Sequence, residues 1–172
     1  MEMRFKPIST EGIAAALEKA HRYRLLNEPR QAESICRDVL HIDKNNETAL
    51  VTMVLALTDQ FGQGLNVSIE HAQQVLPRLG SDYDRVYYEG IILERWGRAQ
   101  LLAAVPGYVV YDWYRRAIDC YERAERIRPQ SNDDAILRWN ACVRVLKRHE
   151  HVRPRAEDHS VELNFNDDVM ML

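Results

Sequence analysis

The sequence predicts an all-α fold of antiparallel helices, and three observations support this class. Apolar residues recur with helical spacing along most of the chain, and no segment alternates in the way that a half-buried strand would. Short turns rich in Pro, Gly and Asn separate the helical segments, which favours antiparallel neighbours. A stripe of small and large residues also recurs, which indicates an internal repeat.

Four helices are expected in the first half of the chain. Ser9 or Thr10 can cap the first, over 9–28, and Pro29 follows its end. The second, over 30–42, carries its apolar residues on one face and precedes a turn at 44–46. The third, over 47–61, is apolar on most sides and is expected to be central; Gly62 and Gly64 end it. The fourth, over 66–76, closes at Pro77.

Three longer helices are expected in the second half. The fifth, over 81–104, has Ser81 or Asp82 as its cap, and the segment 105–109 is predicted to be a turn. The sixth lies in the stretch 114–130, where Pro129 ends it, because proline lacks the N–H group and clashes with the preceding turn. The Ser/Asn/Asp cluster at 131–134 begins the seventh helix, which ends near 149.

The stripe in the sixth helix is the clearest repeated feature. Ala117, Tyr121 and Ala124 share one helix face, so they form a notch and a knob for a neighbouring helix. Equivalent stripes lie in the second and fourth helices, and each preceding helix carries a small residue followed three positions later by a large one. The preceding pairs are Ala20 with Tyr23, Thr52 with Leu55, and Gly90 with Leu93.

These features resemble the tetratricopeptide repeat family, whose units are paired antiparallel helices. The resemblance covers about residues 11–146 and is strongest in "AIDCYERAERIRPQ". It implies an antiparallel helix-pair solenoid of about three repeats, with the seventh helix as a C-terminal capping helix. Lys44 stands where the family usually has proline, and an insertion between Gly90 and Ala117 is interpreted as two lengthened helices. The expected divisions are an N-terminal extension (1–9), a helical domain (10–150) and an acidic tail (151–172).

The resemblance also implies a concave groove lined by the first helix of each pair. Arg24 and Asn140 alone make a poor match to the Lys, Arg and Asn set with which some members clamp a terminal carboxylate. A peptide or helix with apolar anchors is therefore the expected ligand. The groove-facing candidates are Leu17, His21, Arg24, Met53, Tyr87, Ile91, Glu94 and Asn140.

The predicted function is a non-catalytic adaptor or scaffold for a protein or peptide partner. No catalytic, phosphate-binding or metal-binding motif stands out, so no catalytic residue, metal or cofactor is expected. The net charge of −3 argues against general attraction to nucleic acid or anionic membranes, and the longest apolar stretch, 49–57, is far shorter than the ~20 residues that span a bilayer. Cys36, Cys120 and Cys142 are expected to be buried free thiols in a cytoplasmic protein.

Other functions remain open at this stage. Tyr and Trp residues cluster within 83–114, where they either pack the enlarged third repeat or form a recognition surface. A small-ligand-binding regulator or enzyme would use this aromatic cluster, and a secretion-type chaperone or a homo-oligomer is a further alternative. Small proteins of this repeat family include secretion chaperones, so that alternative rests on analogy of fold.

The charge changes sign sharply near the C-terminal end. Basic residues dominate 138–155, whereas 156–172 contains five carboxylates, no Lys or Arg, and several apolar residues. Three interpretations are open: a disordered segment without a role, an intramolecular strap on the basic last helix or in the groove, and a linear motif that another protein binds.

Overall fold

The computed structural model describes residues 3–64 and 67–155, and these residues form helices, turns and coil without a strand. This result confirms the all-α class. Two short 3₁₀ turns, η1 (Thr10–Gly12) and η2 (Leu76–Arg78), accompany the α-helices. The seven α-helices of the described residues are α1 (Ile13–Leu25), α2 (Pro29–Ile42), α3 (Glu47–Thr58), α4 (Ile69–Gln73), α5 (Asp82–Leu102), α6 (Gly107–Ile127) and α7 (Asp134–Arg148).

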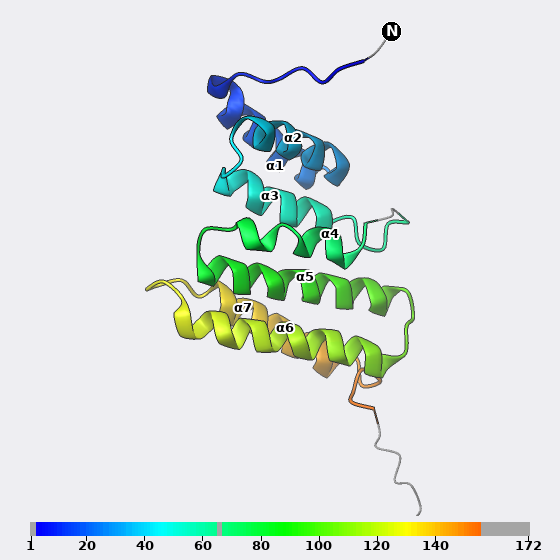
Figure 1. Ribbon diagram of the computed structural model, residues 1–172. Coiled ribbons are helices and arrows are strands. Elements are labelled where there is room, and N and C mark those ends of the chain that lie inside the picture. The colour runs from blue at the N-terminus through cyan, green and yellow to red at the C-terminus, as the bar shows by residue number, and fades with distance from the viewer. Residues whose placement is uncertain (1–2, 65–66, 156–172) are drawn as a thin grey trace, which may run out of the picture.

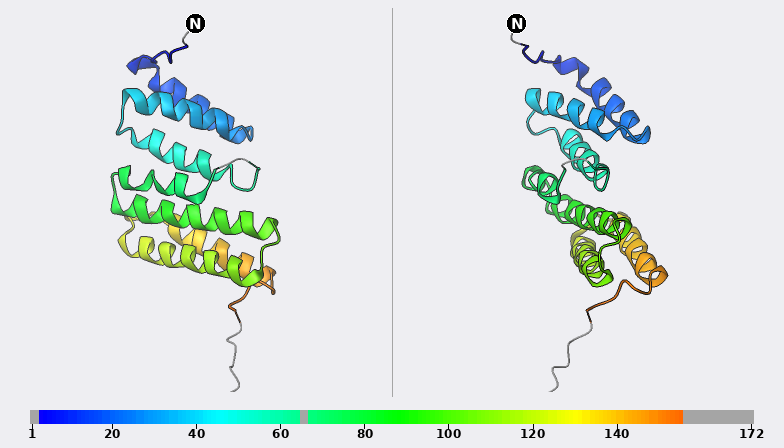
Figure 2. Two further views of the ribbon diagram at one scale, coloured as in Figure 1. Left: turned by 45° about the vertical axis from the view of Figure 1, so that its right-hand side comes forward. Right: turned by 90° about the vertical axis from the view of Figure 1, so that its right-hand side faces the viewer.

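Successive helices lie side by side and run in opposite directions, as Figure 1 shows for α1 to α6. The closest neighbours are α1 with α2, α2 with α3, α5 with α6, and α6 with α7. In the right-hand view of Figure 2, α1 and α7 lie towards one side of the stack and α2, α4 and α6 towards the other. Residues of all four odd-numbered helices also line one hollow, so these helices share one face of the molecule.

Helix α3 is central, as its apolar sequence predicts. Most of its residues are buried, including Leu50 and Val54, because α2 covers one side of it and α4 and α5 cover the other. The Asn46 side chain accepts a hydrogen bond from the Ala49 N–H at 3.0 Å, which caps the first turn of α3. The hydrophobic core is continuous from α1 through α3 to α6.

The notch and knob predicted for the sixth helix are present between α5 and α6. Tyr121 is fully buried, and its ring lies against Gly90 so closely that a Cβ atom at Gly90 would be 2.6 Å from Tyr121 Cε1. Gly97 allows a second close approach, to Trp113 and Tyr114. Two glycines on α5 thus let the two longest helices pack tightly.

Helices α1 and α3 each end three residues before the expected 28 and 61, and α4 and α6 differ more clearly from the expected ranges. Helix α4 covers only Ile69–Gln73 and is followed by η2, because Pro77 lacks the N–H group and restricts the residue before it. Helix α6 begins at Gly107, inside the segment predicted as a turn. Pro106 precedes its first residue, where the missing N–H group costs nothing because the first turn has no intrahelical acceptor for it.

The chain after α7 packs against the start of α6. Val152 is buried, and Gly107 makes room for this segment, since a Cβ at Gly107 would lie 2.0 Å from the His151 carbonyl oxygen. The expected acidic tail beyond residue 155 lies outside the described residues. Among the described helices, none is both long enough and apolar enough to cross a membrane.

Candidate binding groove

A hollow of about 780 Å³ opens on the face shared by the odd-numbered helices, and we call it the inner groove. It is lined by the last turns of α1, the end of α3 with the following turn, the second half of α5 and one side chain of α7. The principal lining residues are His21, Arg24, Leu25, Asp59, Glu94, Arg95, Arg98, Leu102 and Arg138.

Asp59 connects two walls of the groove. Its Oδ2 atom accepts a hydrogen bond from Arg24 Nε of α1 at 2.7 Å, and its Oδ1 atom forms an ion pair with Arg95 of α5. Arg95 Nη1 also donates to Thr58 Oγ1 at 2.8 Å. Desolvation lowers the pKa of Arg95, and the Asp59 carboxylate opposes this effect. The guanidinium stays charged, since arginine keeps its proton in proteins. Asp59 therefore ties α1 to α5.

Glu94 organises the other end of the groove floor. Its Oε2 atom accepts a hydrogen bond from the Tyr121 hydroxyl at 2.7 Å and lies 3.2 Å from Arg138 Nε of α7. Burial first, and then the Glu94 charge, raise the pKa of Tyr121, so its hydroxyl remains a neutral donor. Desolvation works against the charge of Arg138, but Glu94 and Tyr121 together outweigh it and raise the pKa of Arg138.

The groove has more positive than negative charge. Four arginines line it against two carboxylates, and those two carboxylates are already engaged by Arg24, Arg95 and Arg138. Arg98 is exposed and forms no ion pair with any residue that the structure describes. Leu25 and Leu102 extend from the rim and are 88% and 78% exposed. The inner groove thus combines the unpaired guanidinium of Arg98 with two exposed leucine side chains on its rim.

The predicted groove residues fall into three groups. His21, Arg24 and Glu94 line the inner groove. Tyr87 and Asn140 are half-buried, and the Tyr87 ring stacks on Tyr83 with centroids 5.6 Å apart. The remaining three lie in the hydrophobic core: Leu17, Met53 and Ile91.

The residues that sequence reasoning missed are Asp59, Arg95, Arg98 and Arg138. Arg98 lies four residues after Glu94 on α5, so helical spacing places both on one face and could have identified it. The pairing of Asp59 with Arg24 and Arg95 joins positions far apart in the chain, and periodicity alone does not reveal it.

The aromatic cluster is largely internal packing between α5 and α6. Trp96 contacts Phe61 and Trp113 edge to face, with ring centroids 5.1 Å and 6.5 Å apart. Tyr114 is buried, whereas Tyr108, at the start of α6, is 40% exposed. These contacts favour the packing interpretation of the cluster over a recognition surface.

The three cysteines are free and buried, as the sequence predicts. No group of three or more His, Cys, Asp or Glu side chains is placed to hold a metal ion among residues 3–64 and 67–155. Comparison of the chain with protein-family models, with curated proteins and with solved structures gave no match.

Proposed function

We propose that the chain is a non-catalytic adaptor that binds a peptide or helical segment of a protein partner in the inner groove. The observation that carries this proposal is the combination of an unpaired arginine, three further arginines and two exposed leucines around one hollow. Large exposed apolar side chains beside fixed charges are typical of recognition surfaces.

The groove chemistry defines the class of partner segment. Arginine presents a planar fork of donors that matches a carboxylate, so acidic residues of the partner would contact Arg98 and its neighbours. Apolar residues of the same segment would cover Leu25 and Leu102. This proposed segment is more acidic than the apolar-anchored ligand expected from the sequence. The reason is that Arg138 of α7 joins Arg95 and Arg98 of α5 only in the folded chain.

The helix arrangement supports the same proposal. Antiparallel neighbours with the odd-numbered helices on one face fit the helix pairs of the tetratricopeptide type, in which that face binds peptides. A secretion-type chaperone would be one adaptor of this kind, by analogy of fold. The alternative of a small-ligand regulator at the aromatic cluster draws less support, because most of those rings contact one another.

A displayed library of random peptides tests this function directly. We expect the full chain to select peptides that combine Asp or Glu with apolar residues. Arg98→Glu should weaken their binding about tenfold, since it removes one charge-assisted contact and adds repulsion. Arg126→Glu is the matched control, because Arg126 is also exposed but lies near the end of α6, outside the inner groove. Failure to select any peptide, or equal binding by both variants, would refute the proposal.

A further inference from the structure

We propose that the chain's own acidic segment, residues 156–172, binds back into the inner groove and competes there with the partner. This inference rests on the proposed function, because both use the same groove. It is carried by where the described chain ends and by the chemistry of the segment that follows.

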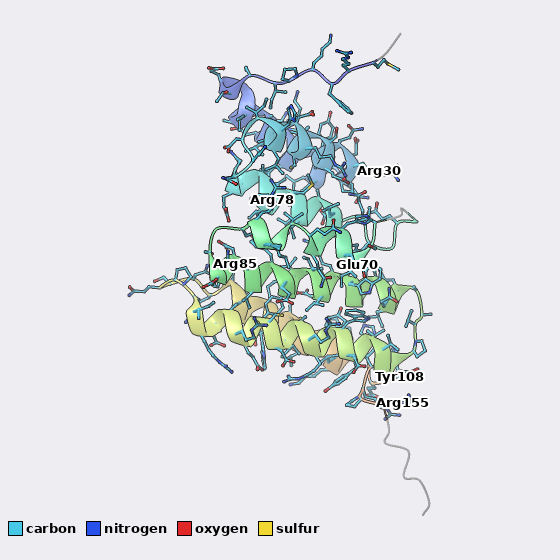
Figure 3. The ribbon with its side chains drawn as sticks, in the orientation of Figure 1. Arg30, Glu70, Arg78, Arg85, Tyr108 and Arg155 are labelled. Carbon is cyan, nitrogen blue, oxygen red and sulfur yellow. The ribbon has the colours of Figure 1, made fainter. Side chains whose placement is uncertain are left out.

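The described chain ends on the side of the helix stack where α1, α3 and α5 also end, and the inner groove is lined by those helix ends (Figure 1). Arg155 lies over the Tyr108 ring, with its Cζ atom 5.4 Å from the ring centroid, and Figure 3 labels both residues beside each other. Tyr108 is the second residue of α6, which follows the turn that leaves α5 at Leu102 and Ala103. Leu102 and Ala103 both line the inner groove. The described chain therefore ends beside the α5–α6 turn, and Ala103 at the start of this turn lines the inner groove.

The segment is long enough to reach the arginines. An extended chain covers about 3.3 Å per residue, so residues 156–172 can span roughly 55 Å. Arg98 precedes Leu102 by one helical turn, which is about 6 Å along the axis of α5. Even a bent path from residue 155 leaves enough chain to follow the groove.

The charges and apolar groups of the segment complement those of the groove. Its carboxylates are Glu157, Asp158, Glu162, Asp167 and Asp168, and it has no Lys or Arg. Apolar residues, including Val161, Leu163 and Phe165, are interleaved with these acids, which suits a groove with arginines on its floor and leucines on its rim. A covalently attached segment also has a high effective concentration, in the millimolar range for a short flexible connection. Weak contacts would therefore suffice for binding.

A spin label on the acidic segment would locate it. Ser160→Cys, made in the full chain, provides a thiol for a nitroxide, and the native cysteines are buried and should not react. We expect loss of amide NMR signal along the inner groove, at 24–27 and 98–103. Adding Arg98→Glu, or raising NaCl to about 1 M, where the Debye length is about 3 Å, should restore the signal. Adding Arg126→Glu should leave the loss unchanged.

Three results would overturn the inference. The first is signal loss confined to the exposed basic residues of α7, Arg144, Lys147 and Arg148. The second is no localised loss. The third is loss in the groove that survives both Arg98→Glu and high salt, because such binding would not depend on charge.

A competition experiment separates this inference from the proposed function. The probe is a fluorescent peptide with the sequence of 156–172. It is titrated against the full chain and against a variant in which Gln or Asn replaces the five acidic residues of 156–172, which we call the tail-neutral chain. The tail-neutral chain should bind the probe about tenfold tighter, because its own segment competes less. If both chains bound the probe with equal affinity, and Arg98→Glu weakened both, the groove would still be a peptide site. That result would overturn the proposal that the chain's own segment occupies it. Groove-localised spin-label contacts, together with no selected foreign peptides, would instead keep self-binding and refute the adaptor. The tail-neutral chain carries Glu157→Gln, Asp158→Asn, Glu162→Gln, Asp167→Asn and Asp168→Asn.

Discussion

Gly90→Ala is expected to destabilise the fold, although alanine is normally the better helix residue. The added Cβ would lie 2.6 Å from Tyr121 Cε1 and 2.9 Å from Cδ1, well inside the normal carbon–carbon contact of about 3.5–4.0 Å. The ring cannot turn out into solvent without leaving the core, since Tyr121 is fully buried. Its hydroxyl is also held by Glu94 at 2.7 Å.

The magnitude follows from three contributions. Alanine gains about 1 kcal/mol of helix propensity over glycine. Overpacking in a close-packed core costs about 1–3 kcal/mol, and displacement of the ring would cost about 1 kcal/mol more through its hydrogen bond to Glu94. The expected net loss in the free energy of unfolding is therefore about 1–3 kcal/mol. For a chain of this length, the melting temperature should fall by about 3–10 °C.

Urea unfolding followed by circular dichroism is the assay, and the midpoint should fall while the slope m stays constant. Gly97→Ala is the matched control on the same helix. Its Cβ would meet Trp113 Cβ at 3.1 Å, a milder overlap that the propensity gain should roughly offset. If Gly90→Ala were as stable as the wild type, the close packing of α5 on α6 would be refuted.

Three further predictions follow from the described contacts. Asp59→Asn should lower the free energy of unfolding in urea by about 1–3 kcal/mol, because it leaves two partly buried guanidinium groups without their carboxylate. As a control, Asp119→Asn, which breaks an exposed pair with Arg115, should lower it by less than about 0.5 kcal/mol. Equal losses in the two variants would contradict this prediction. A thiol reagent should leave the cysteines of the folded chain unmodified and react with them after unfolding, since burial raises the pKa of Cys36 and Cys120 to about 12. Rapid labelling of cysteines in the folded chain would contradict this prediction. Burial likewise raises the pKa of Tyr88 and Tyr114 to about 12, so above the unfolded pKa of about 10 the folded chain binds more protons than the unfolded chain. The midpoint of urea unfolding should therefore fall between about pH 9 and about pH 11. A midpoint that does not change over this range would contradict the prediction.

Local pattern was sufficient to predict the helices and one packing contact. Pro129 predicted the end of α6 at Ile127 to within two residues, and the stripe centred on Tyr121 predicted a knob that packs on a neighbouring helix, which in the structure is α5 at Gly90. The exceptions are also local. Pro77 shortens α4, and Pro106 allows α6 to begin earlier than the turn pattern suggested.

The groove was less predictable, because its residues come from helices that are distant in the chain. Position within a helix identifies a face, but not which part of that face the neighbouring helices cover. Helical position therefore predicts Leu17, Met53 and Ile91 for the groove, although they lie in the core. On α7, Arg138 and the predicted Asn140 are two residues apart, so they point in different directions, and it is Arg138 that lines the inner groove.

The most direct test of peptide recognition by the inner groove is the affinity of the tail-neutral chain for the fluorescent 156–172 peptide, with and without Arg98→Glu. We expect Arg98→Glu to weaken binding about tenfold and to reduce its dependence on salt, while Arg126→Glu changes the affinity by less than about twofold. Unchanged affinity in Arg98→Glu, or equal losses in both variants, would contradict the claim that the inner groove recognises acidic segments through its arginines.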